Sequence, residues 1–154
     1  MITINKIISK IINKGISISV AESCTGGLIA NSLTRNKGIS KIFSFGIICY
    51  SNNSKIKYLS VPEKKIIKFG AVSSEVALEM IKGLYRNERT QICVSTTGIA
   101  GPGGGTKEKP VGLVYIGIRF QNKNLIFKKK FKGSRISIQT KTRDFIFRKI
   151  NRLI

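Results

Sequence analysis

The pattern of hydrophobic and polar positions divides the chain into alternating helical and extended segments. Isoleucines at positions 4, 7, 8, 11 and 12 recur with helical spacing and predict a core-facing first helix over residues 3–14, which ends at Gly15. Ile16–Val20 alternates hydrophobic and polar residues, as a strand does. Residues 25–35 then predict a helix that begins in a Gly-Gly turn. The chain therefore opens with a helix, a strand and a second helix.

The rest of the chain continues this alternation. Further helices are predicted near 52–59, from Pro62, from Ser73 to about residue 87, and over 135–153. Further strands are predicted over Phe43–Tyr50, over Gln91–Thr97, and in a hairpin of Val111–Phe120 and Leu125–Phe131 that turns at 121–124. This order predicts an α/β fold, a three-layer sandwich in which helices flank a mixed sheet. We expect residues 1–154 to form a single domain.

Composition narrows the class of protein. No hydrophobic run approaches the roughly 20 residues that a membrane-spanning helix needs, and polar residues interrupt the first ten positions too often for a secretory signal. The cysteines, Cys24, Cys49 and Cys93, are odd in number and form no CxxC pair. We therefore expect a cytoplasmic protein with no membrane partner, no disulfide framework and no zinc site.

The chain is strongly basic, with 28 Lys and Arg against 7 Asp and Glu and a net charge of +21. Such a charge fits nucleic-acid binding. It also fits compositional bias, because Ile, Lys and Asn are abundant together, as in AT-rich coding sequence. The lysines are scattered, except at 128–130 and in the C-terminal segment, which favours bias and leaves nucleic acid as an open alternative. Whatever its origin, the positive charge attracts small anionic substrates.

The sequence contains no histidine, which excludes Ser-His-Asp and Cys-His catalysis. A general base must then be a lysine, a tyrosine, a cysteine or one of the seven carboxylates. Seven carboxylates are also few for a carboxylate-rich metal site, so no metal is expected.

A first candidate site is the loop AESCTGG at Ala21–Gly27. Ser23 lies between a strand and small residues that lead into a helix. There its hydroxyl would be exposed as a nucleophile, and the N–H groups of Cys24–Gly27 would hold an oxyanion. The same spacing fits a plain helix cap by Ser23 or Thr25, and spacing alone favours the cap.

A second candidate site is the glycine-rich loop Thr96–Thr106. Its glycines allow a ligand to approach the backbone closely, or N–H groups to surround an anion. It lacks the Gly-Lys-Ser/Thr ending of a Walker A loop and the last glycine of GxGxxG. Glycine content fits a mobile surface loop equally well.

A third candidate is Lys55, at a predicted strand-to-helix junction. In the absence of histidine it is the leading base for Ser23, provided that burial or a second cation lowers its pKa from the ordinary value of about 10.4. Composition alone favours the other interpretation, a solvated surface lysine.

Four motifs in the same order resemble one family. AESCTGG, Y-S-N-x-x-K, GAVS-x-E and TTGIAGPGGGT-x-x-KPVG lie between about Val20 and Gly112 and resemble the CinA C-terminal domain family. Members of that family are nicotinamide-nucleotide amidases, and the domain also occurs fused behind a nucleotide-pyrophosphatase domain. The resemblance implies an α/β sandwich, a homo-oligomer, and hydrolysis of nicotinamide mononucleotide, an anionic nucleotide, to nicotinic acid mononucleotide and ammonia without a metal or organic cofactor.

The resemblance also implies roles for individual residues. Ser23 matches the nucleophile, and Tyr50 and Lys55 match the pair that activates it. The expected substrate-binding residues are Cys24, Thr25, Gly26, Gly27, Thr97, Gly98, Gly101 and Arg135.

The segment after the predicted hairpin departs from the family pattern, which typically reads Gly-Asp-Arg followed by further arginines. Here Gly133-Ser134-Arg135 is followed by Gln139, Thr140 and Lys141, so Lys141 or Arg143 would have to assist Arg135 at the phosphate. Three alternatives stay open: Lys55 binds the phosphate while another group is the base; the substrate is a different amide; or the protein is a basic nucleic-acid-binding or regulatory protein with a vestigial amidase site.

Overall fold

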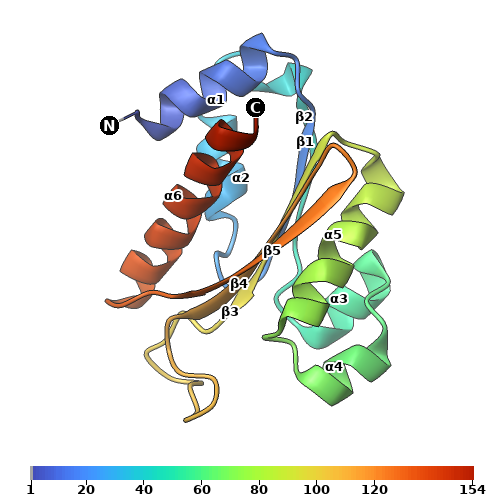
Figure 1. Ribbon diagram of the computed structural model, residues 1–154, viewed down its shortest axis with the longest axis vertical. Helices are drawn as coiled ribbons and strands as arrows, with labels where there is room; N and C mark the ends of the chain where they lie inside the picture. Colours follow the sequence, from blue (N-terminus) through green and yellow to red (C-terminus); the bar gives the residue numbers. More distant parts are fainter. Residues whose placement is uncertain (1) are drawn as a thin grey trace.

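The computed structural model of the protein describes residues 2–154 and contains a five-stranded sheet between two layers of helices (Figure 1). The strands are β1 (Ile18–Glu22), β2 (Phe43–Ile48), β3 (Ile92–Gly98), β4 (Leu113–Phe120) and β5 (Lys123–Lys130). The helices are α1 (Ile4–Asn13), α2 (Leu28–Thr34), α3 (Asn52–Leu59), α4 (Glu63–Phe69), α5 (Ser74–Glu88) and α6 (Arg135–Leu153), with a short 3-10 helix, η1, at Ile39–Lys41. The predicted three-layer α/β fold with a mixed sheet is confirmed.

The strand order is β2-β1-β3-β4-β5. β1 runs parallel to both of its neighbours, so Val20 pairs with Gly46 of β2 and with Val94 of β3. β4 and β5 complete the sheet as an antiparallel hairpin. The carboxyl ends of β1, β2 and β3 therefore meet at one edge. The connection from β1 to β2 carries α2 over one face of the sheet, and the connection from β2 to β3 carries α3, α4 and α5 over the other. Open α/β sheets bind ligands at such a point.

Each face of the sheet has its own hydrophobic core. α1, α2 and α6 cover one face, and α3, α4 and α5 cover the other (Figure 1). Ile7, Ile8 and Ile11 of α1 are buried in the first core, as their helical spacing predicts. Leu84 of α5 and Leu59 of α3 belong to the second. Burial on both faces fixes the sheet, and thereby the strand ends from which the site is built.

The predicted helix ends are confirmed where the sequence carries a specific signal. α1 is followed by Gly15 with a φ of +62°, the left-handed conformation that glycine adopts without strain. Ser73 caps α5 by accepting a hydrogen bond from the Val76 N–H at 3.2 Å. Ser134 caps α6 in the same way, with the N–H of Ser137. These caps account for the start of the two longest helices.

The predicted boundaries differ from the structure at several places; α2 and β2, for example, are shorter than predicted. β1 starts at Ile18 and extends to Glu22, and both of its faces are buried because it lies inside the sheet. Its polar Ser19 is tolerated there because its hydroxyl hydrogen-bonds Thr90 at 2.7 Å. The hairpin turns at residues 121–122, where both residues adopt a positive φ, and not over 121–124. The 3-10 helix η1 was not predicted.

Within residues 2–154, no helix is both long enough and apolar enough to cross a membrane. Cys24, Cys49 and Cys93 are buried and carry free thiols.

Candidate active site

A pocket of about 260 Å³ opens at the edge where the parallel strands end. The loops after β1, β2 and β3 surround it, together with the α4–α5 connection and the start of α6. Its lining residues are Ser23, Cys24, Tyr50, Asn52, Lys55, Ala71, Val72, Thr97, Gly98, Ile99, Ala100, Gly101, Gly103, Gly104 and Arg135. All four sequence motifs therefore contribute to one pocket.

Ser23 and Lys55 form a hydrogen-bonded pair in this pocket, with 3.1 Å between Lys55 Nζ and Ser23 Oγ. Ser23 directly follows β1, and Lys55 lies in α3, which Ser51 caps through the Ser54 N–H at 3.0 Å. Lys55 is only 1 % exposed. The interpretation of Lys55 as a solvated surface lysine is therefore wrong.

The other contacts of Lys55 suit a neutral amine. Its Nζ lies 2.8 Å from the Cys49 carbonyl oxygen and 3.5 Å from the Ser51 carbonyl oxygen. The protonated amine donates to the Ser23 hydroxyl and to both carbonyl oxygens. Because carbonyl oxygens only accept hydrogen bonds, the neutral amine can keep its two N–H groups on them and turn its lone pair to the Ser23 hydroxyl. Burial lowers the pKa of Lys55, and Lys55 takes part in none of the ion pairs among residues 2–154.

The helix-cap interpretation of Ser23 and Thr25 is wrong as well. The N-cap of α2 is Gly27, which contributes no side chain. Glu22 replaces it: its carboxylate accepts hydrogen bonds from the N–H groups of Gly27 at 3.0 Å, Ile29 at 3.1 Å and Ala30 at 2.8 Å. The hydroxyl of Thr25 instead bonds the hydroxyl of Thr96 at 2.8 Å. Ser23 Oγ is thereby free to pair with Lys55.

The remaining N–H groups of this loop limit the choice of oxyanion donors. Ser23 donates to the Thr96 carbonyl oxygen at 3.2 Å, and Gly26 donates to the Ser23 carbonyl oxygen at 3.0 Å. With Gly27 bound to Glu22, the N–H groups of Cys24 and Thr25 are the two in Ser23–Gly27 without a hydrogen-bond acceptor. Of the four N–H groups of Cys24–Gly27 that were expected to hold the oxyanion, only those of Cys24 and Thr25 are therefore available.

The loop after β3 forms one wall of the pocket. Thr97 turns its hydroxyl away from solvent and donates to the Ala71 carbonyl oxygen at 2.7 Å, which ties β3 to the α4–α5 connection. Gly98 packs directly on β4, because a Cβ at that position would lie 2.7 Å from the Leu113 carbonyl oxygen. Gly101 packs on the side chain of Val111 in the same manner. The glycines here allow close packing and bring the loop against the pocket.

Arg135 and Tyr50 form the rim. The Arg135 guanidinium donates to the Gly101 carbonyl oxygen at 2.7 Å and to the Tyr50 hydroxyl. Tyr50 is 59 % exposed, and its hydroxyl makes no hydrogen bond with Lys55 or Ser23. The expected pairing of Tyr50 with Lys55 is thus absent from this structure, and Tyr50 pairs with Arg135.

Lys141 and Arg143 do not line the pocket. Lys141 Nζ donates to the Lys132 carbonyl oxygen at 2.6 Å, and Arg143 pairs with Asp144 at 2.7 Å. The expectation that one of them assists Arg135 at the phosphate therefore gains no support from these contacts and stays a prediction. Gln139 lies closer to the site, because its side-chain amide donates to the Cys24 carbonyl oxygen at 2.9 Å.

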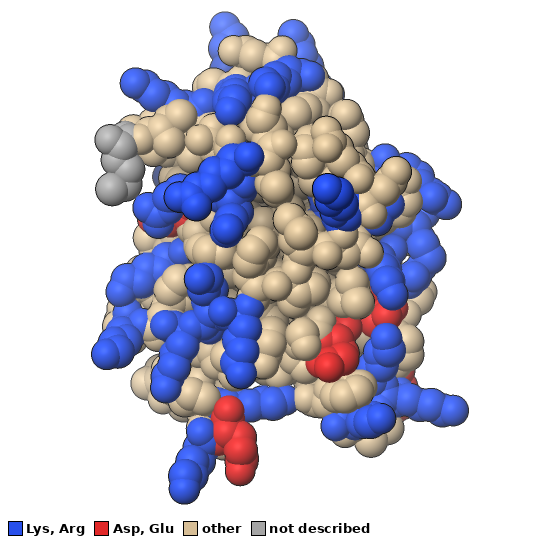
Figure 2. Space-filling model, in the orientation of Figure 1, with Lys and Arg blue, Asp and Glu red and all other residues tan. Residues whose placement is uncertain are grey.

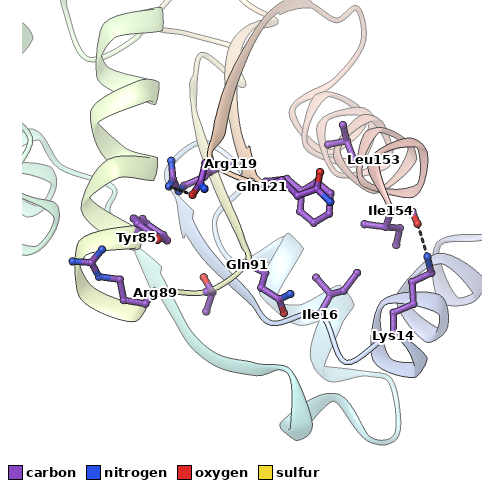
Figure 3. A pocket seen from close by; sticks show the side chains of 12 residues that line it. Lys14, Ile16, Tyr85, Arg89, Gln91, Arg119, Gln121, Leu153 and Ile154 are labelled. Atoms are coloured by element: carbon purple, nitrogen blue, oxygen red, sulfur yellow. Dashed lines mark hydrogen bonds between the residues drawn. The ribbon is translucent and has the colours of Figure 1, made fainter.

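A larger hollow of about 410 Å³ lies at the opposite end of the sheet (Figure 3). Its cations already have partners: Arg119 donates to the side-chain oxygens of Asn122 and Asn124 at 3.1 Å and stacks on Tyr85, with 3.8 Å to the ring centroid. Lys14 reaches the last turn of α6 (Figure 3). Its lining contains no pair of a nucleophilic side chain and a buried base in contact with it. The smaller pocket is therefore the candidate active site.

Basic side chains lie on every side of the face seen in Figure 2, with a few acidic side chains toward its lower part. On this face the positive charge is not concentrated in one patch. Among residues 2–154, no three His, Cys, Asp or Glu side chains are grouped so as to hold a metal ion.

Sequence reasoning missed residues that act through the backbone of the loops. Glu22 and Thr96 hold Ser23–Gly27, and Cys49 offers its carbonyl oxygen to Lys55. The position of Glu22 next to Ser23 could have indicated a role, since it is one of only seven acidic residues in the chain. The carbonyl of Cys49 carries no sequence signal, because every residue has one.

Comparison with known proteins gives consistent results. The family model described as the CinA C-terminal domain matches residues 2–154. A CinA-like protein of Fusobacterium nucleatum is 55% identical over 126 residues, which cover 82% of this chain and 30% of that protein. A CinA-like protein of Kosmotoga olearia is 46% identical over 144 residues, which cover 93% of this chain and 35% of that protein. The chain thus spans about a third of the length of these curated relatives.

A solved structure has the same fold. The competence/damage inducible protein CihA from Agrobacterium tumefaciens superposes with a TM-score of 0.91 at 38% sequence identity, with 96% of this chain and 90% of that chain covered.

Proposed function

The chain belongs to the CinA C-terminal domain family, and we propose that it is an amidase that hydrolyses the carboxamide of nicotinamide mononucleotide through Ser23 and Lys55. The observation that carries this proposal is the buried Lys55 Nζ at 3.1 Å from Ser23 Oγ, with two carbonyl oxygens as its other partners. An amine held in this way supplies a lone pair to the hydroxyl, which is what a serine nucleophile needs in a chain without histidine.

The proposed reaction begins with acylation of Ser23. Neutral Lys55 removes the hydroxyl proton, Ser23 Oγ forms a bond to the carboxamide carbon, and the carbonyl electron pair moves onto oxygen. The N–H groups of Cys24 and Thr25 stabilise this oxyanion, each such donor being worth about 3 kcal/mol. Lys55 then gives its proton to the departing nitrogen, the C–N bond breaks, and ammonia leaves an ester on Ser23.

Deacylation repeats these steps with water. Lys55 removes a proton from water, the water oxygen attacks the ester carbon, and the second tetrahedral intermediate collapses with cleavage of the bond to Ser23 Oγ. The proton on Lys55 returns to Ser23. The products are the carboxylic acid and the free enzyme, and no redox or metal step is needed to balance the reaction.

An anionic nucleotide suits the rim of the pocket. Arg135 presents a guanidinium beside the exposed ring of Tyr50, and the net charge of +21 attracts anions from a distance. We assign the phosphate to Arg135 and a substrate contact to Tyr50. Lys55 is a poor phosphate ligand, because it is buried and its Nζ already contacts two carbonyl oxygens. The scattered basic side chains do not favour nucleic acid as the natural ligand.

Ammonia release tests the proposal. Purified protein is incubated with nicotinamide mononucleotide, nicotinamide riboside, nicotinamide and an unrelated nucleotide amide, and ammonia is quantified over a range of enzyme concentrations. We expect the mononucleotide to be hydrolysed with the highest kcat/KM. Ammonia from a different amide alone would change the substrate and keep the chemistry. No ammonia from any amide, combined with salt-dependent binding of an oligonucleotide, would favour the nucleic-acid alternative.

A further inference from the structure

We propose that Glu22 is a positioning residue for the Ser23 site: its carboxylate holds the turn Ser23–Gly27 so that the N–H groups of Cys24 and Thr25 face the oxyanion. This inference rests on the proposed function, because it concerns the same acyl transfer. The Glu22 carboxylate makes no hydrogen bond with the nucleophile or its base, and its role is to fix the backbone turn that follows the nucleophile.

The first observation is the burial and saturation of the carboxylate. Glu22 is 1 % exposed, and its two oxygens accept three backbone hydrogen bonds of 2.8–3.1 Å. Burying a carboxylate is costly unless such bonds compensate for the lost water. Plain helix capping is normally done by a short side chain at the N-cap, but here Gly27 occupies that position with a φ of +96°. The cap therefore comes from the residue that precedes the nucleophile.

The second observation is that the turn is held at both ends. At its start, the Ser23 N–H donates to β3, and the hydroxyl of Thr25 bonds that of Thr96 on the same strand. At its end, Glu22 binds Gly27 and the first turn of α2. Between these two sets of hydrogen bonds, the N–H groups of Cys24 and Thr25 are left without acceptors. The N–H directly after a nucleophile is a common oxyanion donor. Cys24 holds that position and lines the pocket, and the N–H of Thr25 follows it in the same turn.

The third observation separates Glu22 from the base. Glu22 forms no hydrogen bond or ion pair with Lys55, whose pKa is lowered chiefly by burial. Loss of the carboxylate should therefore disturb the oxyanion donors and leave the titration of Lys55 in place. A residue that acted through the base would instead shift the pH profile.

The test uses Glu22→Gln, which keeps the size of the side chain but turns an amide N–H₂ toward backbone N–H groups. We expect kcat to fall by about ten-fold or more, since loss of one oxyanion donor costs about 10²–10³-fold in kcat. KM should stay within about two-fold of wild type, and the midpoint of the pH profile should not move. Glu22→Asp, which keeps the charge on a shorter side chain, should give a smaller loss of kcat and guards against misfolding of the first variant.

Glu79→Gln is the matched control. Glu79 is also a buried carboxylate, but it pairs with Lys65 and Lys82 and does not line the pocket. Its substitution should lower the melting temperature without lowering kcat. If Glu22→Gln and Glu79→Gln lose activity only in proportion to their melting temperatures, Glu22 serves the fold alone and the inference is wrong.

A second readout separates this inference from the proposed function. An alkyl fluorophosphonate reacts with an activated serine and places its phosphoryl oxygen where the oxyanion would lie, so it requires no amide substrate. We expect Glu22→Gln to react more slowly than wild type at every pH. If wild type reacts and Glu22→Gln reacts equally fast, the inference fails and the amidase proposal stands. If wild type neither reacts nor releases ammonia, both fail.

Discussion

The two ends of the central sheet carry hollows of different chemical character. At the carboxyl ends of the parallel strands, a pocket of about 260 Å³ contains a buried amine that contacts a serine hydroxyl. At the opposite end, a hollow of about 410 Å³ contains Arg119, Lys14 and Tyr85. Both are lined by cations, and size alone would favour the larger hollow as a ligand site. They differ in what the cations are paired with.

That difference decides which end can do chemistry. Arg119 stays charged at any physiological pH, and two asparagine oxygens and an aromatic ring hold it. Lys55 has no carboxylate partner, and burial lowers its pKa, so it is the cation that can become a base. A lysine becomes a catalyst when the fold removes water from it and offers it only neutral partners.

The largest effect is expected when the nucleophile is removed from the smaller pocket. Ser23→Ala should lower amidase kcat by about 10⁴-fold or more, as loss of the nucleophile does in other serine hydrolases. Arg119→Ala, at the other end of the sheet, should leave kcat unchanged. Both are measured by ammonia release, with melting temperatures recorded. Full activity in Ser23→Ala would overturn the mechanism.

The next largest effect concerns the base. Wild-type activity should rise with pH through an apparent pKa below the ordinary lysine value, because only neutral Lys55 accepts the proton. Lys55→Arg keeps the charge but cannot lose its proton, so kcat should fall by about 10²–10⁴-fold. The check is a pH–rate profile of both proteins. A wild-type rate in Lys55→Arg would reduce Lys55 to a charge contact.

A smaller effect is expected at the rim. Charge-assisted contacts to a phosphate are worth about 1.5–3 kcal/mol, so Arg135→Ala should raise KM for the mononucleotide by about ten-fold or more. KM for the phosphate-free riboside should hardly change. An equal loss on both substrates would show that Arg135 supports the fold through Gly101 and Tyr50, and that the phosphate binds elsewhere.

The smallest effect is a pH dependence of stability. Because the pKa of Lys55 is lower in the folded chain, the unfolded chain binds more protons in the range between the folded value and about 10.4. Lys55 therefore makes folding more favourable as pH rises through that range. Lys55→Met should remove this contribution, so the difference in unfolding free energy between the two proteins should change with pH. Denaturant titrations at several pH values measure it, and a constant difference would contradict a lowered pKa.

Most of the fold could be predicted from the sequence because its signals are local. Helical spacing, Gly15 and Ser73 give the helices, and hydrophobic runs give the strands. The polar residues in β1 could not be interpreted in this way. Ser19 is buried only because Thr90, far away in the chain, supplies a partner for its hydroxyl, and such pairings depend on the tertiary structure.

The sequence predicts which residues form the site better than it predicts which atoms those residues contact. The motifs pointed to Ser23, Lys55 and the loop after β3, and all of them line one pocket. Spacing alone favoured a helix cap at Ser23, because local rules do not show that Glu22 already supplies the cap. Lys141 and Arg143 lie off the pocket for a related reason: on a helix, a shift of one or two residues changes the face, and neither follows Arg135 by three or four residues, as Gln139 does.

The most direct test of the central claim is the pH dependence of covalent labelling at Ser23. Wild-type protein is treated with an alkyl fluorophosphonate at a series of pH values, and peptide mass spectrometry identifies the modified residue. We predict a single adduct on Ser23, a labelling rate that rises with pH through the lowered pKa of Lys55, and no adduct in Lys55→Met. An adduct at another residue, or labelling of Lys55→Met at the wild-type rate, would contradict the assignment of Ser23 and Lys55 as nucleophile and base.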